Sequence, residues 1–118
     1  MGYDIKLLDK NKKIVQSERA LYSLGGYFDK TGIHEMECGI TYNYSSVLNK
    51  VFPDSKGIKY LNNRIARDTY SVLGNAINKL QDNYSNDYFE PTEGNVKKAL
   101  LSLYQMALRK PDAVWQIK

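Results

Sequence analysis

The segment Ile40-Thr41-Tyr42-Asn43-Tyr44 carries the side chains best suited to binding chemistry. Two phenol rings can stack on a planar ligand, while their hydroxyls and the Asn43 amide can hydrogen-bond to its edge. None of these groups is a strong nucleophile or a strong metal ligand. As a strand, the segment would put Ile40, Tyr42 and Tyr44 on one face and Thr41 and Asn43 on the other. The sequence therefore predicts binding rather than catalysis.

A second interpretation of the same residues is structural. Tyr42 and Tyr44 can be core aromatics whose hydroxyls reach the surface, and Asn43 can close the strand as a turn or cap residue. The pair Gly25-Gly26 can be a tight turn or a place where backbone approaches a ligand. Both interpretations stay open at the level of sequence.

The residues that could support enzymatic or metal chemistry are few. His34 is the only histidine and Cys38 the only cysteine, so no Cys/His zinc site can be assembled. On a strand, Glu35 and Glu37 share the face opposite to His34, which does not favour an acid–base pair. Cys38 has no neighbouring cations and is expected to be a small buried hydrophobe. The chain also lacks a phosphate-binding loop and a nucleophile elbow, so we expect no enzyme and no cofactor.

Composition limits the class of protein further. The chain has 118 residues, 42% hydrophobic and 25% charged, which fits one globular domain with a real core. Its net charge of +4 is divided evenly between the two halves, and the cluster Lys10-Asn11-Lys12-Lys13 is expected to be a solvated turn. Nucleic-acid binding is therefore not expected. The absence of a signal-like or membrane-spanning apolar run predicts a cytoplasmic protein.

The first half of the chain has a β pattern. Alternating residues predict an N-terminal β-hairpin over residues 3–17 with its turn at 9–12. Residues 18–33 are expected to form a loop or an irregular strand, and their glycines predict that the backbone passes close to a neighbour there. The best strand of the chain, 35–43, follows. A short helix is then expected, beginning at residue 44 or 45 and ending at Phe52.

The second half has helical periodicity. Apolar residues three or four apart predict a helix over 61–81, in which Gly74 would mark a close packing contact. A second helix is expected over 92–110, with Thr92 as its N-cap. The tail 112–118 carries the only tryptophan, which we expect to anchor it by packing. The predicted fold is α+β, a small antiparallel sheet (N-terminal hairpin plus strand 35–43) packed against two long C-terminal α-helices.

Several short blocks occur in a characteristic order along the chain. They are Gly25-Gly26, Ile40-Thr41-Tyr42-Asn43-Tyr44, Tyr88-Phe89, Thr92-Glu93-Gly94-Asn95 and Pro111-Asp112 with Trp115. This order resembles a family of small uncharacterised phage and prophage proteins, and the resemblance covers nearly the whole chain. The chain differs from the pattern at Tyr27, Gly39 and Phe89, where the pattern has threonine, asparagine and tryptophan.

The resemblance implies a non-catalytic phage protein that counteracts host antiviral defence in the infected bacterial cell. We expect it to bind and sequester a nucleotide-derived immune signal, usually at a homo-oligomer interface. A tyrosine would stack on the base, and the backbone amides at the glycine pair and the Thr92 helix start would hold phosphate. The alternative is an inhibitor, similar in action to an anti-CRISPR protein, that binds a host defence protein directly. The candidate ligand-binding residues are Gly25, Gly26, Tyr42, Asn43, Tyr44, Arg64, Arg67, Thr92 and Asn95.

Overall fold

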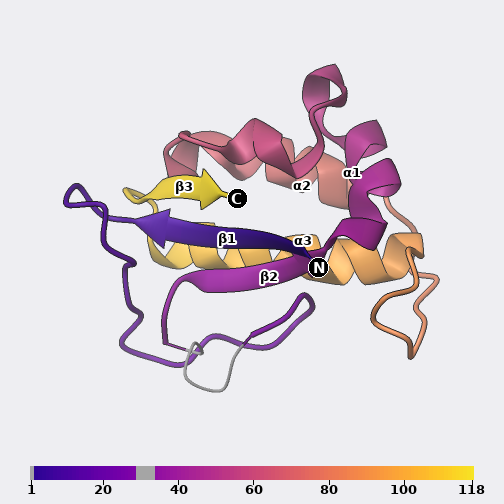
Figure 1. The fold of residues 1–118 in the computed structure, drawn as a ribbon, viewed down its shortest axis with the longest axis horizontal. Helices are drawn as coiled ribbons and strands as arrows, with labels where there is room; N and C mark the ends of the chain where they lie inside the picture. The colour runs from indigo at the N-terminus through magenta and orange to yellow at the C-terminus, as the bar shows by residue number, and fades with distance from the viewer. Residues whose placement is uncertain (1, 29–33) are drawn as a thin grey trace.

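A three-stranded antiparallel sheet joins the two ends of the chain (Figure 1). The computed structural model describes residues 2–28 and 34–118. Its strands are β1 (Gly2–Leu8), β2 (Glu37–Thr41) and β3 (Val114–Ile117), in the order β2-β1-β3. The central strand β1 therefore pairs with the last segment of the chain as well as with β2.

The period of two along the strands separates a core face from an outer face. Ile5 and Leu7 of β1 are fully buried, and Cys38 and Ile40 of β2 are each 1% exposed. Asp4 lies opposite Gly39 in the register and belongs to the other face. The sheet thus buries one side and leaves the side that carries Asp4 and Gly39 open.

Helix α3 (Glu93–Arg109) runs behind the sheet and covers its core face (Figure 1). Its buried residues recur at helical spacing, and Thr92 caps its first turn through a hydrogen bond from the Asn95 N–H to Thr92 Oγ1 (3.1 Å). This confirms the predicted helix over 92–110. Across the described ranges, every helix is too short or too polar to cross a lipid bilayer.

Two shorter helices complete the core, and one of them differs from prediction. Helix α1 (Ser45–Val51) forms as expected, whereas the predicted helix over 61–81 contains only α2 (Tyr70–Asn78). Four 3-10 turns lie between β2 and α2, namely η1 (Tyr42–Tyr44), η2 (Pro53–Ser55), η3 (Gly57–Leu61) and η4 (Ala66–Thr69). The structure therefore has one long helix rather than two.

Tertiary hydrogen bonds explain why the helix over 61–81 is interrupted. The Asn63 N–H donates to the Trp115 carbonyl (2.9 Å), and the Trp115 N–H donates to the Arg64 carbonyl (2.9 Å). Ile65 forms a β-bridge with Val114 in the same stretch. Because this backbone pairs with β3, it cannot also bond within a helix, although its apolar residues keep helical spacing.

The predicted N-terminal hairpin is only half correct. Its turn forms, since the Asp9 N–H donates to the Lys13 carbonyl (2.8 Å) and Asp9 Oδ1 accepts from two backbone amides. The returning arm at 13–17 makes isolated bridges instead of a strand. β2 takes the arm's expected place along residues 2–6 of β1, and the tail pairs with the opposite edge of β1 as β3. Trp115 of β3 is fully buried, as expected for a packing anchor.

The predicted strand 35–43 is also shorter in the structure. It ends at Thr41, whose Oγ1 accepts the Asn43 N–H (3.3 Å) and turns the chain into η1. Tyr42 is consequently 47% exposed and Tyr44 only 1% exposed. The prediction that these two rings share one face of a strand is wrong, because the strand has already ended.

Candidate functional site

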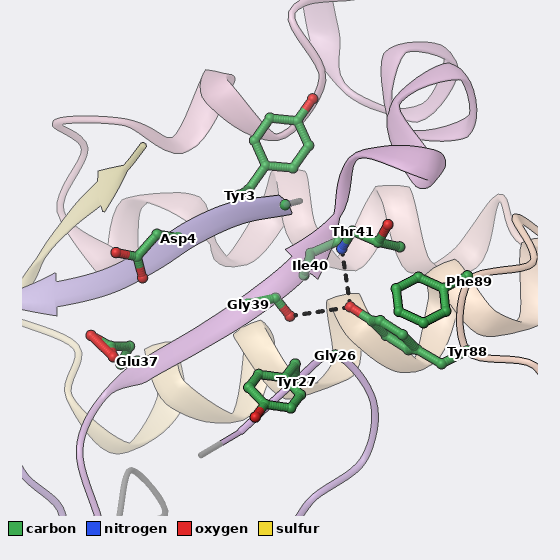
Figure 2. A pocket seen from close by; sticks show the side chains of 11 residues that line it. Tyr3, Asp4, Gly26, Tyr27, Glu37, Gly39, Ile40, Thr41, Tyr88 and Phe89 are labelled. Carbon is green, nitrogen blue, oxygen red and sulfur yellow. Dashed lines mark hydrogen bonds between the residues drawn. The ribbon is translucent and has the colours of Figure 1, made fainter.

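An open pocket of about 790 Å³ lies on the outer face of the sheet beside β2 (Figure 2). Its floor is the bare backbone around Gly39, and its walls come from two segments far apart in the sequence. The residues that line it are Gly2, Tyr3, Asp4, Gly26, Tyr27, Glu37, Gly39, Ile40, Thr41, Tyr88 and Phe89.

The first wall is Tyr27, which is held against the edge of β2. The Tyr27 N–H donates to the Gly39 carbonyl (2.7 Å), and the Gly39 N–H donates to the Tyr27 carbonyl (2.8 Å). The preceding Gly26 has φ +74°, and a Cβ there would lie 2.7 Å from Cys38 Sγ. Only glycine fits this turn, which leaves the Tyr27 side chain 65% exposed.

The second wall consists of Tyr88 and Phe89. The Thr41 N–H donates to the Tyr88 hydroxyl oxygen (3.0 Å), and that hydroxyl donates weakly to the Gly39 carbonyl (3.5 Å) (Figure 2). Burial raises the pKa of the Tyr88 hydroxyl, so it stays protonated at neutral pH. Phe89 packs edge-on to Tyr88, with ring centroids 5.1 Å apart, and remains 56% exposed.

Two of the residues predicted for ligand binding instead fix this second wall. The Tyr44 hydroxyl donates to the Tyr88 carbonyl, and Asn43 Nδ2 donates to the Phe89 carbonyl (3.0 Å). They tie the loop 82–90 to the turn after β2, so their role in the structure is positioning.

Asn95 holds the same loop from α3. Its Oδ1 accepts the Ser85 N–H (3.0 Å), and its Nδ2 donates to the carbonyls of Asp87 and Glu90 (3.0 Å each). The residue is 6% exposed, and these three bonds connect it to the middle and the end of the loop. A signal for this role exists in the sequence, because Asn95 lies in the first turn of a helix that follows a polar loop.

The first turn of α3 makes its own hydrogen bonds within the protein. Thr92 Oγ1 accepts the Asn95 N–H, and Asn83 Oδ1 accepts the Gly94 N–H (3.0 Å). The Val96 N–H is bonded to the Thr92 carbonyl (3.1 Å). Three amides near this helix start therefore already have acceptors, which leaves Thr92 as a cap.

Gly25 and Tyr42 lie near the pocket without lining it. The Gly25 N–H donates to Ser102 Oγ (2.9 Å), and that hydroxyl donates back to the Gly25 carbonyl (2.7 Å). The prediction that backbone passes close to a neighbour at the glycine pair is confirmed, and the neighbour is α3. Tyr42 packs edge-on against Tyr3, with ring centroids 4.8 Å apart, and Tyr3 in turn lines the pocket.

Arg64 and Arg67 are not among the residues that line the pocket. The Arg64 guanidinium lies 4.0 Å from the centre of the Tyr60 ring, and its Nε donates to the Tyr60 carbonyl (2.7 Å). Arg67 forms an ion pair with Asp112. Both cations are engaged elsewhere on the surface.

Two carboxylates define the charge of the pocket. Lys6 Nζ lies 3.3 Å from Asp4 Oδ2 and 3.5 Å from Glu37 Oε2. Partial burial lowers the pKa of Lys6, but the two carboxylates outweigh this and raise it above its usual value of 10.5. The described lining includes neither lysine nor arginine. The group of three side chains therefore has one negative charge in excess at neutral pH.

The one cysteine next to this site is not available as a nucleophile. Cys38 lies beneath Gly26, but it is 1% exposed and burial raises its pKa to about 12, so it is a neutral thiol at pH 7. Within the described ranges, no cluster of three His, Cys, Asp or Glu side chains could hold a metal ion.

Sequence reasoning overlooked most of the residues that line the pocket, including Tyr3, Asp4 and Glu37. Tyr27, Gly39 and Phe89 line it as well. No local spacing signals that residues 27, 39 and 89 meet, since only the packing of separate segments brings them together.

A scan against protein-family models and searches of curated proteins and of solved structures find no match to this chain.

Proposed function

We propose that this is a non-catalytic binding protein whose pocket receives part of a partner protein. The observation that carries the proposal is the pair of exposed rings, Tyr27 and Phe89, on the two walls of one open pocket. Aromatic side chains at the centre of a hollow are typical binding hot spots between proteins. Given the resemblance to phage and prophage proteins, the proposed partner is a host defence protein that this protein inhibits.

The alternative is sequestration of a nucleotide-derived immune signal between the same two rings. Nucleotide phosphates are normally held by cations or by free backbone amides. This pocket offers the carboxylates of Asp4 and Glu37, and the start of α3 has internal acceptors for its amides. These features favour a protein partner over a phosphorylated ligand.

The test compares two exposed tyrosines of the same segment. Tyr27 lines the pocket and is 65% exposed, whereas Tyr22 is 69% exposed and lies outside it. Tagged wild type, Tyr27→Ala/Phe89→Ala and Tyr22→Ala are expressed in bacterial cells, co-purified proteins are quantified, and the enriched partner is purified for calorimetry. Since a hot-spot side chain contributes about 2 kcal/mol or more, we expect affinity to fall at least a hundredfold in the double variant.

The control Tyr22→Ala should keep the affinity of the wild type within about threefold, since that ring does not line the pocket. Equal binding by the double variant and the wild type would refute the proposal. A thermal-shift screen with cyclic dinucleotides, cyclic trinucleotides and ADP-ribose derivatives tests the alternative, because a tightly bound ligand raises the unfolding temperature.

A further inference from the structure

The two ends of the pocket differ in chemistry (Figure 2). Asp4 and Glu37 lie at one end, Tyr88 and Phe89 lie at the other, and Tyr27 lies between the two ends beside Gly39. The end with carboxylates can attract a cation, and the aromatic end can cover an apolar side chain. A partner that matches both ends must present these two kinds of side chain a short distance apart.

The sheet register fixes how far apart the two ends are. Lys6 pairs with Glu37 and Asp4 with Gly39, so the two carboxylates are diagonal neighbours on the outer face. From Glu37 to Thr41, where Tyr88 is attached, the strand advances by roughly 13 Å at about 3.3 Å per residue. An extended peptide of about four residues spans that length.

At the end of the pocket that carries Asp4 and Glu37, the negative charges outnumber the positive charge of Lys6. Two carboxylates share the single ammonium of Lys6, and their side chains keep 52% (Asp4) and 35% (Glu37) exposure. This local negative site occurs on a protein whose net charge is +4. A basic side chain of a partner would complement it, whereas a phosphate or an acidic peptide would be repelled.

The backbone along this edge of β2 is already bonded. Gly39 exchanges two hydrogen bonds with Tyr27, and the Thr41 N–H donates to the Tyr88 hydroxyl. A partner peptide therefore cannot add to β2 as a fourth strand and must be recognised through its side chains. The bare floor at Gly39 lets the peptide backbone approach the sheet closely.

We propose that the pocket binds an extended segment of the partner protein in which an arginine or lysine lies two to four residues from an aromatic or large aliphatic side chain. The basic group meets Asp4 and Glu37, and the apolar group inserts between Tyr27 and Phe89. This inference rests on the proposed function, because it names the kind of protein segment that the pocket receives.

The test uses a phage-displayed library of random octapeptides, panned on the wild-type protein and depleted on Tyr27→Ala/Phe89→Ala. We expect enriched peptides to combine one arginine or lysine with one large apolar residue at this spacing. The enriched consensus peptide, labelled with fluorescein, then serves as the probe in anisotropy titrations, beside a version whose basic residue is glutamine.

Charge variants of the protein separate the two ends of the pocket. The double variant Asp4→Asn/Glu37→Gln should weaken binding of the basic peptide at least tenfold. Its affinity for the glutamine peptide should equal that of the wild type. Lys6→Met, which leaves two unbalanced carboxylates, should tighten binding of the basic peptide. Binding of that peptide should weaken between 50 and 500 mM salt, because exposed charges are screened.

A variant that fills the floor provides a further check. A Cβ at Gly39 would meet nothing closer than 3.6 Å, so Gly39→Val should fold, and thermal unfolding checks this. The variant should prevent binding of both the basic peptide and the glutamine peptide. Enrichment of acidic peptides, of peptides without a basic residue or of no peptide at all would overturn the inference. If partner binding still depends on Tyr27 and Phe89 in that case, the proposed function stands and only the basic segment is wrong.

Discussion

Two glycines of this chain differ in whether a side chain would fit. A Cβ at Gly25 would lie 2.4 Å from the Lys98 backbone carbon, whereas a Cβ at Gly74 would meet nothing within 4 Å. The expectation that Gly74 marks a close packing contact is therefore wrong, and the close contact is at Gly25. Spacing along a helix cannot distinguish a crowded glycine from an open one.

The glycine pair gives a direct stability prediction. Gly74→Ala should raise the free energy of unfolding by about 0.5–1 kcal/mol, because alanine is the better helix former and has room. Gly25→Ala should lower it by about 3 kcal/mol, because the methyl group would push the chain off α3 and break its two bonds with Ser102. Urea denaturation of both variants measures these changes, and destabilisation by Gly74→Ala would contradict the prediction.

Two buried groups, the Cys38 thiol and the Tyr44 hydroxyl, should make the protein less stable at high pH. Burial raises the pKa of Cys38 from 9.0 to about 12, and burial followed by the nearby Tyr88 raises that of Tyr44 from 10.0 to about 12. Above pH 9 the unfolded chain loses these protons first, so their contribution to stability is complete below pH 9 and declines toward pH 12.

We predict that Cys38→Ala flattens the loss of stability between pH 9 and 10.5. Each group can cost up to about 1.4 kcal/mol per pH unit, so removal of the thiol should reduce the slope by a comparable amount. At pH 7 the variant should be less stable, because it leaves a small void. Urea denaturation across the pH range measures this, and parallel slopes for both proteins would show that the thiol does not titrate as stated.

At the scale of elements, the loop 82–90 owes its position to side chains outside it. Tyr44 and Asn43 hold it from the turn after β2, and Asn95 holds it from α3. Phe89 is therefore presented to the pocket by hydrogen bonds rather than by burial of its own ring, which is 56% exposed.

Removal of the α3 anchor should release this loop. Asn95→Ala breaks three hydrogen bonds, which predicts a loss of about 2–3 kcal/mol in stability, faster amide hydrogen exchange in 82–90 and weaker binding at the pocket. The matched control is Asn75→Ala, an exposed asparagine of α2, which should change none of these. Unchanged exchange in the loop of Asn95→Ala would show that other contacts hold it.

For the whole molecule, β3 links the sheet to the region between α1 and α2. Trp115 is fully buried, and its Nε1 donates to Thr69 Oγ1 (3.0 Å), while its backbone bonds to Asn63 and Arg64. Strand β3 therefore connects the sheet to the region between α1 and α2 through both its buried side chain and its backbone.

Trp115→Phe should lower the free energy of unfolding by about 2–4 kcal/mol, since it removes buried volume and leaves the Thr69 hydroxyl without this donor. Gln116→Ala, one position along the strand on the opposite face, should cost less than about 1 kcal/mol. Circular dichroism follows both transitions without relying on the tryptophan. Similar losses in the two variants would mean that β3 is held by its backbone alone.

What the sequence by itself determined is local. The features that it predicts are the cap at Thr92, helix α3, the turn at 9–12, helix α1 and the burial of Cys38. Each depends on residues within a few positions, so spacing and turn chemistry suffice to predict it. The α+β class follows from the same local patterns.

Only the tertiary structure decided the rest. The stretch 61–69 has helical spacing, yet its backbone at 63–65 bonds to β3. The tail forms a strand by pairing with the edge of β1 that β2 leaves open. The pocket arises where Tyr27, Gly39 and Phe89 meet, through hydrogen bonds between segments far apart in the chain. Such pairings depend on which partner each backbone group finds in the folded molecule, and a linear pattern does not contain that choice.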